Sequence, residues 1–408
     1  MTRSPPSSPT VGLLALWGLA LACGGDAAET PAGPATVSIR STGAPLPAVR
    51  SAPLPASAEA LGVTGDGTPV IASSEGVLAL GPSSLEPRRL FAGPGDPVLL
   101  GTVRALAPRR EGGAWLGSDV GLFTVDRLYV LPLSTEPSPI SAVAEVAEGP
   151  LAGVWLLTAE ALYLSTEAAL DRFAIPDLLG PLAGLAVDPA GRRAITFAGP
   201  ETLLLEPVGR DLDVWPLPVD VGAARAVAAS ESGLWVAAEA GLFVLPAESG
   251  PEAWAEVRVD GAPVDAVTLA SEPSGAFALD RAGRLLALDL DEAAVLAEGL
   301  PTSARLSGDG RGGAWVAADG SLDGYRIDAP SFAADVRPFV ETHCARCHGD
   351  PGADYRDYAV FAPRAEAALD RVRAGDMPRC EDDQRCDEGL PEETYEVLER
   401  WIQGGMLP

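Results

Sequence analysis

Residues 112–118 read GGAWLGS, and two residues later residues 121–123 read GLF. The pattern recurs at residues 233–238, GLWVAA, which lead to a second GLF at residues 241–243. Two further copies read GVWLL at residues 153–157 and GGAWVAA at residues 312–318. Each copy joins a short apolar run to a turn marked by glycine, which is typical of one strand following another. The chain therefore contains an internal repeat, and this repeat decides the fold.

The spacing of the repeat indicates a β-propeller. Weaker copies fall around Val70, Ile195 and Phe277, and the seven anchors are separated by 38 to 45 residues. Short strands at a period near 40 residues match the four-stranded blade of a propeller. We predict an all-β propeller of seven blades over residues 37–328, with the repeated Trp side chains packed between blades. Residues 36–40 are expected to supply the outer strand of the last blade, because an open edge invites unwanted pairing.

The copies with Gly-x-Trp followed by Gly-Leu-Phe resemble the propeller repeats of two-component-regulator sensor regions. This resemblance covers about 270 residues and implies a fold more than a function. The region contains no His and no Cys, so it lacks the usual ligands for copper, zinc or a second haem. A calcium or quinone-type site built from Asp, Asn and Arg stays open, although no clustered Asp-x-Asp-x-Asp motif is present. We therefore do not expect an active site in the propeller.

A second motif lies near the end of the chain, where residues 344–348 read CARCH. The spacing C-x-x-C-H is the attachment signature of a c-type haem. On a helix, positions i, i+3 and i+4 share one face. Cys344 and Cys347 can therefore form thioethers with the porphyrin vinyl groups while His348 reaches the iron from the same side. A zinc site would need four ligands, and a dithiol redox pair usually lies in a βαβ context, so one covalent haem c is favoured.

Four stretches between residues 331 and 408 carry a family resemblance: DVRPF at 335–339, CARCHG at 344–349, RAGDMP at 373–378, and 390–405 from LPEE to WIQGG. The whole segment resembles the small cytochrome c domains at the C-terminus of many bacterial exported and lipid-anchored proteins. The resemblance implies a small all-α haem domain. Helical spacing agrees with it, because Phe332, Val336, Phe339 and Val340 would line one helix, and Val397, Leu398, Trp401 and Ile402 another.

The second axial ligand of the iron is expected to be Met377. A haem that transfers electrons, like the His/Met cytochromes c, places a thioether sulfur opposite the His. Met377 lies in Gly-Asp-Met-Pro, as the distal Met of the family does, whereas Met406 lies close to the end of the chain, where chains fray. His343 adjoins the attachment Cys and is badly placed to reach the opposite face of the ring. It is interpreted as facing solvent or a propionate, and an open or different axial position is the alternative.

The N-terminus is interpreted as an export signal. Arg3 is the only charge before an apolar run at residues 11–22, which is too short to span a bilayer but fits a secretory signal. Residues 19–25, LALACGG, resemble a bacterial lipobox in which Cys23 would be acylated, although Ala20 departs from the usual Leu. We predict a signal peptide at residues 1–22 and a lipidated linker at residues 23–36. The alternative is an ordinary cleaved signal that leaves Cys23 free.

Two cysteines are left after these assignments. Cys380 and Cys386 are expected to pair as a disulfide, because an exported protein lies in an oxidising compartment. The protein is accordingly expected in the cell envelope, on the periplasmic side or at the outer membrane, held to the membrane by its N-terminal lipid.

The charge of the chain restricts its partners. The net charge is −28, and such a surface repels the phosphates of nucleic acids. Residues 331–408 carry 9 arginines against 17 acidic residues, a net charge of −8. No basic face is apparent that would steer an acidic redox protein. We therefore expect the redox partner in the cell envelope to be basic or near neutral.

These inferences combine into one expected function with two alternatives. The chain is expected to be an exported electron-transfer lipoprotein, a one-electron carrier through haem c, with the propeller as its docking scaffold. Closing both axial positions with His348 and Met377 leaves no position for a substrate. The first alternative is an enzyme, a propeller dehydrogenase fused to its cytochrome electron acceptor. The second is a propeller that binds or senses a ligand and carries a haem module.

Overall fold

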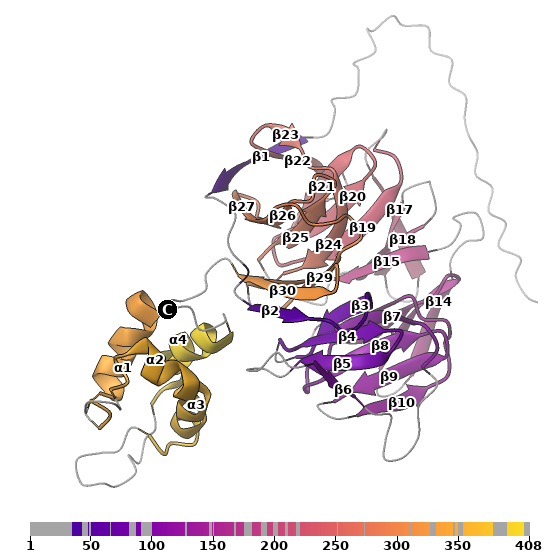
Figure 1. Ribbon diagram of the computed structural model, residues 1–408. Helices are drawn as coiled ribbons and strands as arrows, with labels where there is room; N and C mark the ends of the chain where they lie inside the picture. Colours follow the sequence, from indigo (N-terminus) through magenta and orange to yellow (C-terminus); the bar gives the residue numbers. More distant parts are fainter. Residues whose placement is uncertain are drawn as a thin grey trace, which may run out of the picture. The chain divides into compact units, whose positions relative to one another are not determined.

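The structure is a computed structural model, in which the described strands lie between residues 35 and 326 and the helices between residues 332 and 403 (Figure 1). The described residues are 35–42, 48, 50–65, 67–80, 87–90, 100–126, 129–146, 149, 151–166, 169–174, 182–188, 194–198, 203–208, 211–217, 221–250, 252–272, 274–310, 312–326, 332–345, 347–349, 354–377 and 390–403.

The strands form consecutive antiparallel meanders in which each strand pairs with the next. The first meander contains β3 (Ala58–Val63), β4 (Pro69–Ser73), β5 (Gly76–Leu80) and β6 (Pro87–Arg89). The second contains β7 (Val103–Pro108), β8 (Ala114–Ser118), β9 (Gly121–Val125) and β10 (Val130–Ser134). The third contains β11 (Ala142–Val146), β12 (Gly153–Leu157), β13 (Ala161–Ser165) and β14 (Leu170–Ala174). The fourth contains β15 (Leu182–Val187), β16 (Ala194–Ala198), β17 (Leu203–Val208) and β18 (Asp211–Pro216).

The remaining meanders follow the same plan. One contains β19 (Ala224–Ala229), β20 (Gly233–Ala238), β21 (Gly241–Pro246) and β22 (Ala255–Val259), with the short β23 (Ala262–Pro263) paired to β22. The next contains β24 (Ala266–Ser271), β25 (Ala276–Asp280), β26 (Leu285–Leu288) and β27 (Glu292–Ala297). The last contains β28 (Arg305–Gly308), β29 (Gly313–Ala318) and β30 (Ser321–Arg326).

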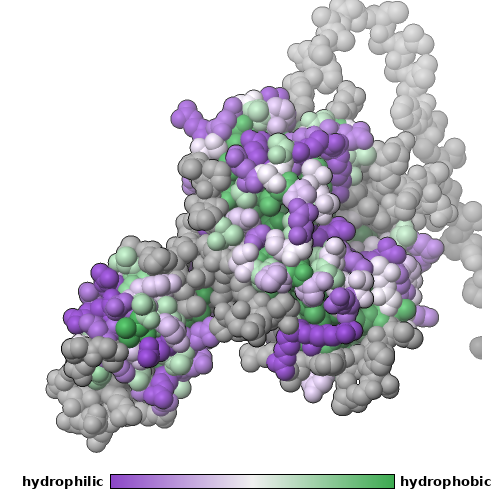
Figure 2. Space-filling view, viewed as in Figure 1, coloured by the Kyte–Doolittle hydropathy of each residue, from purple (hydrophilic) through white to green (hydrophobic). Residues whose placement is uncertain are grey.

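The first strands of the meanders contact one another around a ring. Along the chain the contacts run from β3 through β7, β11, β15, β19 and β24 to β28, and β28 contacts β3 in turn. Radial sheets arranged around a ring of first strands are the architecture of a β-propeller. On the face that Figure 2 shows, hydrophobic residues are scattered among hydrophilic ones.

The ring is closed by an N-terminal strand, but not by the one expected. Strand β2 (Arg50–Pro53) pairs antiparallel with β30 and completes the last meander. Strand β1 (Ala35–Thr42), which contains the expected residues 36–40, instead runs parallel to β22 and then to β27. The side chain of Ile39 is 1% exposed in this position. The assignment of residues 36–40 was therefore wrong, because burial of Ile39 between two neighbouring sheets fixes β1 at their outer edges.

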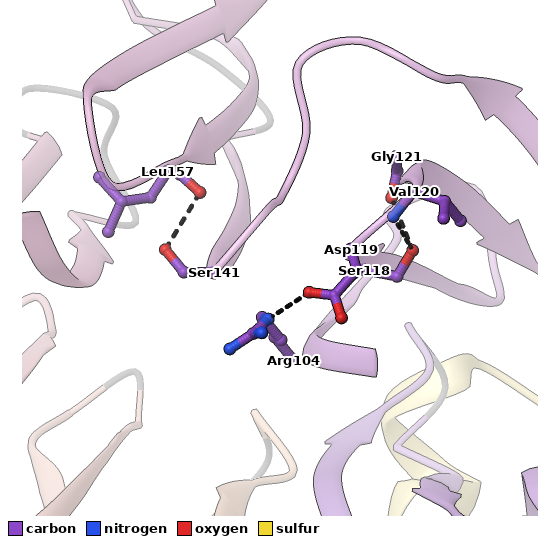
Figure 3. A network of polar contacts seen from close by, with 7 residues as sticks. All are labelled: Arg104, Ser118, Asp119, Val120, Gly121, Ser141 and Leu157. Carbon is purple, nitrogen blue, oxygen red and sulfur yellow. Dashed lines mark hydrogen bonds and ion pairs between the residues drawn. The ribbon is translucent and has the colours of Figure 1, made fainter. Parts of the chain in front are cut away.

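Polar side chains stabilise the turns that join the second and third strands. The Ser118 hydroxyl accepts a hydrogen bond from the Val120 N–H at 3.2 Å and donates to the Gly121 carbonyl at 3.3 Å (Figure 3). Thr158 makes the corresponding bonds one sheet later. Gly121 has a φ of +136°, and a Cβ at this position would overlap the carbonyl oxygen of Ser134. This overlap explains the glycine at position 121, whereas at Gly241 a Cβ would have no atom closer than 3.8 Å.

The repeated tryptophans are part of the core. Trp155 and Trp235 are fully buried, and Trp115 and Trp315 are 8% and 5% exposed. Trp115 packs with Ile140 and Leu156 of the following sheet. The expectation that these side chains pack between sheets is confirmed.

The helices form a separate aromatic core. They are a π-helix η1 (Phe332–Val336), α1 (Arg337–His343), α2 (Tyr358–Phe361), a 3₁₀ turn η2 (Ala362–Arg364), α3 (Ala365–Arg373) and α4 (Glu392–Gln403). Fully buried Phe332, Phe361 and Trp401 lie with their ring centroids 5.6 to 5.9 Å apart. The predicted apolar faces are confirmed, since Val336, Val340 and Leu398 are also fully buried. No helix of the described residues is long and apolar enough to cross a membrane.

Candidate functional site

The described residues of C-x-x-C-H, Cys344, Ala345, Cys347 and His348, follow directly after α1, which ends at His343. The carbonyl of Val340 accepts the N–H groups of Cys344 and Ala345, at 2.8 and 2.9 Å, so the helix ends there. A further turn follows, in which Cys347 and His348 donate their N–H groups to the Cys344 carbonyl at 3.1 and 3.0 Å. The backbone therefore carries both thiols and the imidazole on one turn, which is the local arrangement that the spacing predicts.

The two cysteines are unpaired and differ in their surroundings. Cys344 is partly buried against the aromatic core, whereas Cys347 is exposed. Burial raises the pKa of the Cys344 thiol to about 11, and the nearby Cys347 thiolate adds to the effect. Dithiol exchange requires a thiolate, and burial disfavours that form at Cys344. A thioether forms by addition of S–H across a vinyl double bond, and both the sulfur and the proton are kept in the product.

His348 lies flat against an aromatic ring that the sequence analysis did not single out. The imidazole and the Tyr355 ring are parallel within 2°, with their centroids 4.1 Å apart. The Tyr355 N–H also donates to the His348 carbonyl at 2.8 Å. Tyr355 itself packs on Phe361 with a centroid distance of 5.3 Å. The orientation of the imidazole is thereby connected to the core of the helical region.

His343 does not belong to this turn. Its ring lies 5.0 Å from the ring of Phe339 and is half-buried. Burial lowers the pKa of the His343 imidazole. This side chain packs against α1 itself and stays partly exposed, so the expectation that it faces solvent or a propionate stays a prediction.

Met377 follows a well-formed helix end. Gly375, with a φ of +68°, donates its N–H to the Val372 carbonyl at 3.0 Å, and Asp376 donates to the Arg371 carbonyl at 2.8 Å. These two bonds form a Schellman motif, which ends α3 and satisfies its last carbonyl groups. Met377 is half-buried directly after this motif. The chain therefore holds the candidate axial sulfur next to a defined turn rather than within a helix.

Other predicted site residues lie outside the described residues. These are Cys23 with the segment around it, the pair Cys380 and Cys386, and Met406. Among the described residues, no group of three or more His, Cys, Asp and Glu side chains is placed to hold a metal ion. A zinc centre at Cys344 and Cys347 would need its further ligands from elsewhere in the chain. The donor set that the structure does bring together, two thiols and one imidazole on one turn, fits a covalent haem c.

Comparisons with known proteins define the fold. No protein-family model matches the sequence, and no curated protein matches it. Among solved structures, the chain is similar to the β-propeller domain of Cps50 (Swd1) from Myceliophteria thermophila, with 11% identity, a TM-score of 0.52, and coverage of 70% of this chain and 100% of that chain. It is also similar to YCF48 from Cyanidioschyzon merolae, with 14% identity, a TM-score of 0.50, and coverage of 68% and 98%.

A third similar structure is YCF48 bound to D1 peptide, with 14% identity, a TM-score of 0.51, and coverage of 73% of this chain and 99% of that chain. Together with the ring of meanders, these similarities show that the strand-rich region is a β-propeller. Identities of 11% to 14% relate the folds alone, because one fold carries many functions.

Proposed function

We propose that this protein is a one-electron carrier of the cell envelope, a c-type cytochrome joined to a seven-bladed propeller that serves as its docking scaffold. In this proposal haem c is attached through Cys344 and Cys347, and His348 and Met377 ligate the iron. Cys23 carries the lipid that holds the protein at the membrane, and Cys380 pairs with Cys386. The seven blades correspond to the seven copies of the sequence repeat and to the ring of first strands from β3 to β28.

The observation that carries this proposal is the turn at residues 344–348. In support of it, the N–H groups of Cys347 and His348 both donate to the Cys344 carbonyl, so these three residues share one turn. The cysteines are not joined to each other, so both sulfurs are free to form thioethers. Cys344 contacts the aromatic core, where a porphyrin edge would be shielded from water.

The remaining residues supply the environment of the haem. The iron would carry the electron, and the chain would set its potential and exclude other chemistry. Thioether sulfur opposite His raises the potential of a haem and leaves no open position for a substrate. Tyr355 holds the ring of His348, and the Schellman motif after α3 holds the backbone before Met377.

The test is the visible absorption spectrum of the full chain, exported in a host with cytochrome c maturation and recorded in the oxidised and reduced states. We expect covalent, low-spin haem with a weak sulfur-to-iron band, and loss of that band in Met377→Ala. Cys347→Ser should leave a single thioether and shift the reduced absorption bands. A protein without covalent haem contradicts the proposal. A high-spin wild type would instead indicate an open iron and favour the dehydrogenase alternative.

A further inference from the structure

One surface of the propeller combines a cavity with exposed apolar and acidic side chains. The connection from β10 to β11 and the turn from β12 to β13 border a cavity of about 370 Å³. We call it the Leu170 pocket, and the residues that matter for its chemistry are Glu136, Pro137, Pro139, Glu160, Tyr163 and Leu170. A volume of this size accepts one or two large side chains and falls in the range of ligand-binding pockets.

The topology places this pocket on a defined face of the propeller. In an antiparallel meander, the second strand ends at the same side of the sheet where the first strand begins. The connections between meanders and the turns between second and third strands therefore share one face. Arg104 and Asp119 form an ion pair of 2.6 Å on this face (Figure 3). Ser141, which follows the connection, is fixed through its hydroxyl and N–H to the carbonyl of Leu157.

One exposed apolar residue, Leu170, lines the pocket, and others lie in the preceding meander. Among the described residues, the large hydrophobic side chains that are exposed are Val120, Tyr129, Leu131, Leu133 and Leu170. All of them belong to the second and third meanders. Leu133 and Leu170 are 59% and 48% exposed, and β10 leads directly into the connection that borders the pocket. Exposed apolar residues that gather at one place, rather than singly over a surface, indicate an interaction site.

The charged residues that line the pocket are both acidic. Glu136 and Glu160 are exposed, and no basic side chain is among the lining residues. A basic residue, Arg172 of β14, lies directly opposite Tyr163 in the pairing of β13 with β14. The turns between second and third strands also carry an acidic residue in four further meanders: Glu75, Asp119, Glu239 and Asp319. An occupant of the pocket would therefore lie beside two exposed carboxylates, Glu136 and Glu160, with Arg172 on the strand next to Tyr163.

We propose that the Leu170 pocket is the docking site for a basic segment of a partner protein, which inserts one apolar side chain between Pro139, Tyr163 and Leu170 and places arginine or lysine beside Glu136 and Glu160. The inference deepens the proposed function, because it assigns the docking role of the propeller to one surface and one partner chemistry. The open, half-polar cavity suits a side chain presented by another protein. Carboxylates at its border steer a basic partner and reject acidic ones.

The test measures binding of a synthetic peptide to the full-length holoprotein by fluorescence anisotropy. The probe has a central tryptophan between two pairs of arginines, with glycine and serine at both ends. One comparison peptide carries glutamates for the arginines, and a second carries glycine for the tryptophan. We expect the first peptide to bind with a Kd at least about tenfold below that of either comparison peptide. Its affinity should fall as salt is raised from about 0.05 to 0.5 M.

Matched variants locate the site. Glu136→Gln combined with Glu160→Gln should weaken binding of the arginine–tryptophan peptide about tenfold, and Leu170→Ser by a similar factor. The control, Glu231→Gln with Glu292→Gln, removes the same charge from exposed turns on the opposite face and should change the Kd less than about twofold. Equal weakening by the control pair would show that the total charge alone binds the peptide, and it would overturn the assignment.

Further outcomes also overturn the proposal. Equal binding of the peptide without tryptophan would mean that no side chain enters the pocket. Equally tight binding of free tetrabutylammonium would assign the pocket to a small organic cation instead. Protection from hydrogen exchange by the peptide should map to residues 135–140 and 158–163, and protection elsewhere contradicts the site even if a variant fails to fold. The haem spectrum of each preparation is read separately, so loss of docking with normal haem is distinguishable from failure of the proposed electron transfer.

Discussion

The imidazole of His348 and the phenol ring of Tyr355 stack in parallel, 4.1 Å apart and within 2°. Tyr355 lies seven positions after His348 in the sequence. The Tyr355 N–H also donates a hydrogen bond to the His348 carbonyl, so backbone and ring contacts hold the two residues together. If His348 ligates the iron as proposed, this stacking would connect the folding of the helical region to the electronic state of the haem, because an axial ligand acts through its orientation at the iron.

Replacement of Tyr355 should loosen the imidazole. Tyr355→Leu removes the ring, and an aromatic pair is worth about 0.5–1.5 kcal/mol beyond its buried area. We expect a lower denaturant midpoint for the loss of the low-spin spectrum and shifted electron paramagnetic resonance g values. Tyr355→Phe keeps the ring and should retain both properties. If the leucine variant shows the g values of the wild type, Tyr355 does not orient His348.

Gly375 should control how firmly the backbone before Met377 is held. Its φ of +68° costs a residue with a Cβ about 1 kcal/mol or more. Gly375→Ala is therefore expected to destabilise the protein by about 1–2 kcal/mol and to lower the temperature at which the sulfur-to-iron band disappears. Glu396→Ala, at an exposed position of α4, is the control. If the sulfur-to-iron band of Gly375→Ala disappears at the same temperature as that of the wild type, the Schellman motif does not stabilise the ligation of the iron by Met377.

Glu272 should make the stability of the propeller depend on pH. This carboxyl is 7% exposed, accepts one hydrogen bond from the Gly312 N–H at 2.7 Å, and has an oxygen without a partner. Burial raises its pKa to about 7, and the negative charge of Asp309 adds to this while Gly312 and Arg326 act against it. The folded state thus favours the protonated carboxyl. The stability that protonated Glu272 gives the folded protein is complete below pH 4.5, and it is lost as the pH rises through 7.

The variant Glu272→Gln keeps the shape of the protonated group and removes its titration. At pH 8 the variant should be more stable than the wild type by up to about 3 kcal/mol. This is the free energy that corresponds to raising the pKa of Glu272 from 4.5 to about 7. At pH 4.5 the two proteins should unfold at nearly the same denaturant concentration. Chemical denaturation of both proteins from pH 4.5 to 8.5 measures the difference. Parallel curves across this range would show that folding does not raise the pKa of Glu272.

Strand β1 should stabilise the propeller at the outer edges of two sheets. Ile39 is fully buried against both of them, and the backbone and hydroxyl of Ser41 bond to the Asp260 carboxylate. Ile39→Ala should cost about 2–5 kcal/mol, as buried Ile-to-Ala changes do. Ser38→Ala on the opposite, exposed side of β1 should cost little. A small effect of Ile39→Ala on the thermal midpoint would mean that β1 detaches before the propeller unfolds.

Much of the fold was readable from the sequence because local patterns encode it. The Gly-x-Trp repeat predicted the propeller, since strands and turns of one blade are determined by neighbouring residues. The helical spacing of Val336, Val340 and Leu398 predicted their burial. The C-x-x-C-H spacing likewise predicted the turn that carries Cys344 and His348, because hydrogen bonds within one turn depend on residues at most four positions apart.

Other features were decided only by the tertiary structure. The sequence by itself determined that an N-terminal strand closes the ring, but the choice of β2 over residues 36–40 depended on which side chains fit the outer edges of distant sheets. The stacking of Tyr355 on His348, the raised pKa of Glu272 and the Leu170 pocket arise in the same way. Each depends on groups that packing brings together from separate segments. Contacts between distant segments produce no periodic pattern in the sequence, so the sequence alone could not predict them.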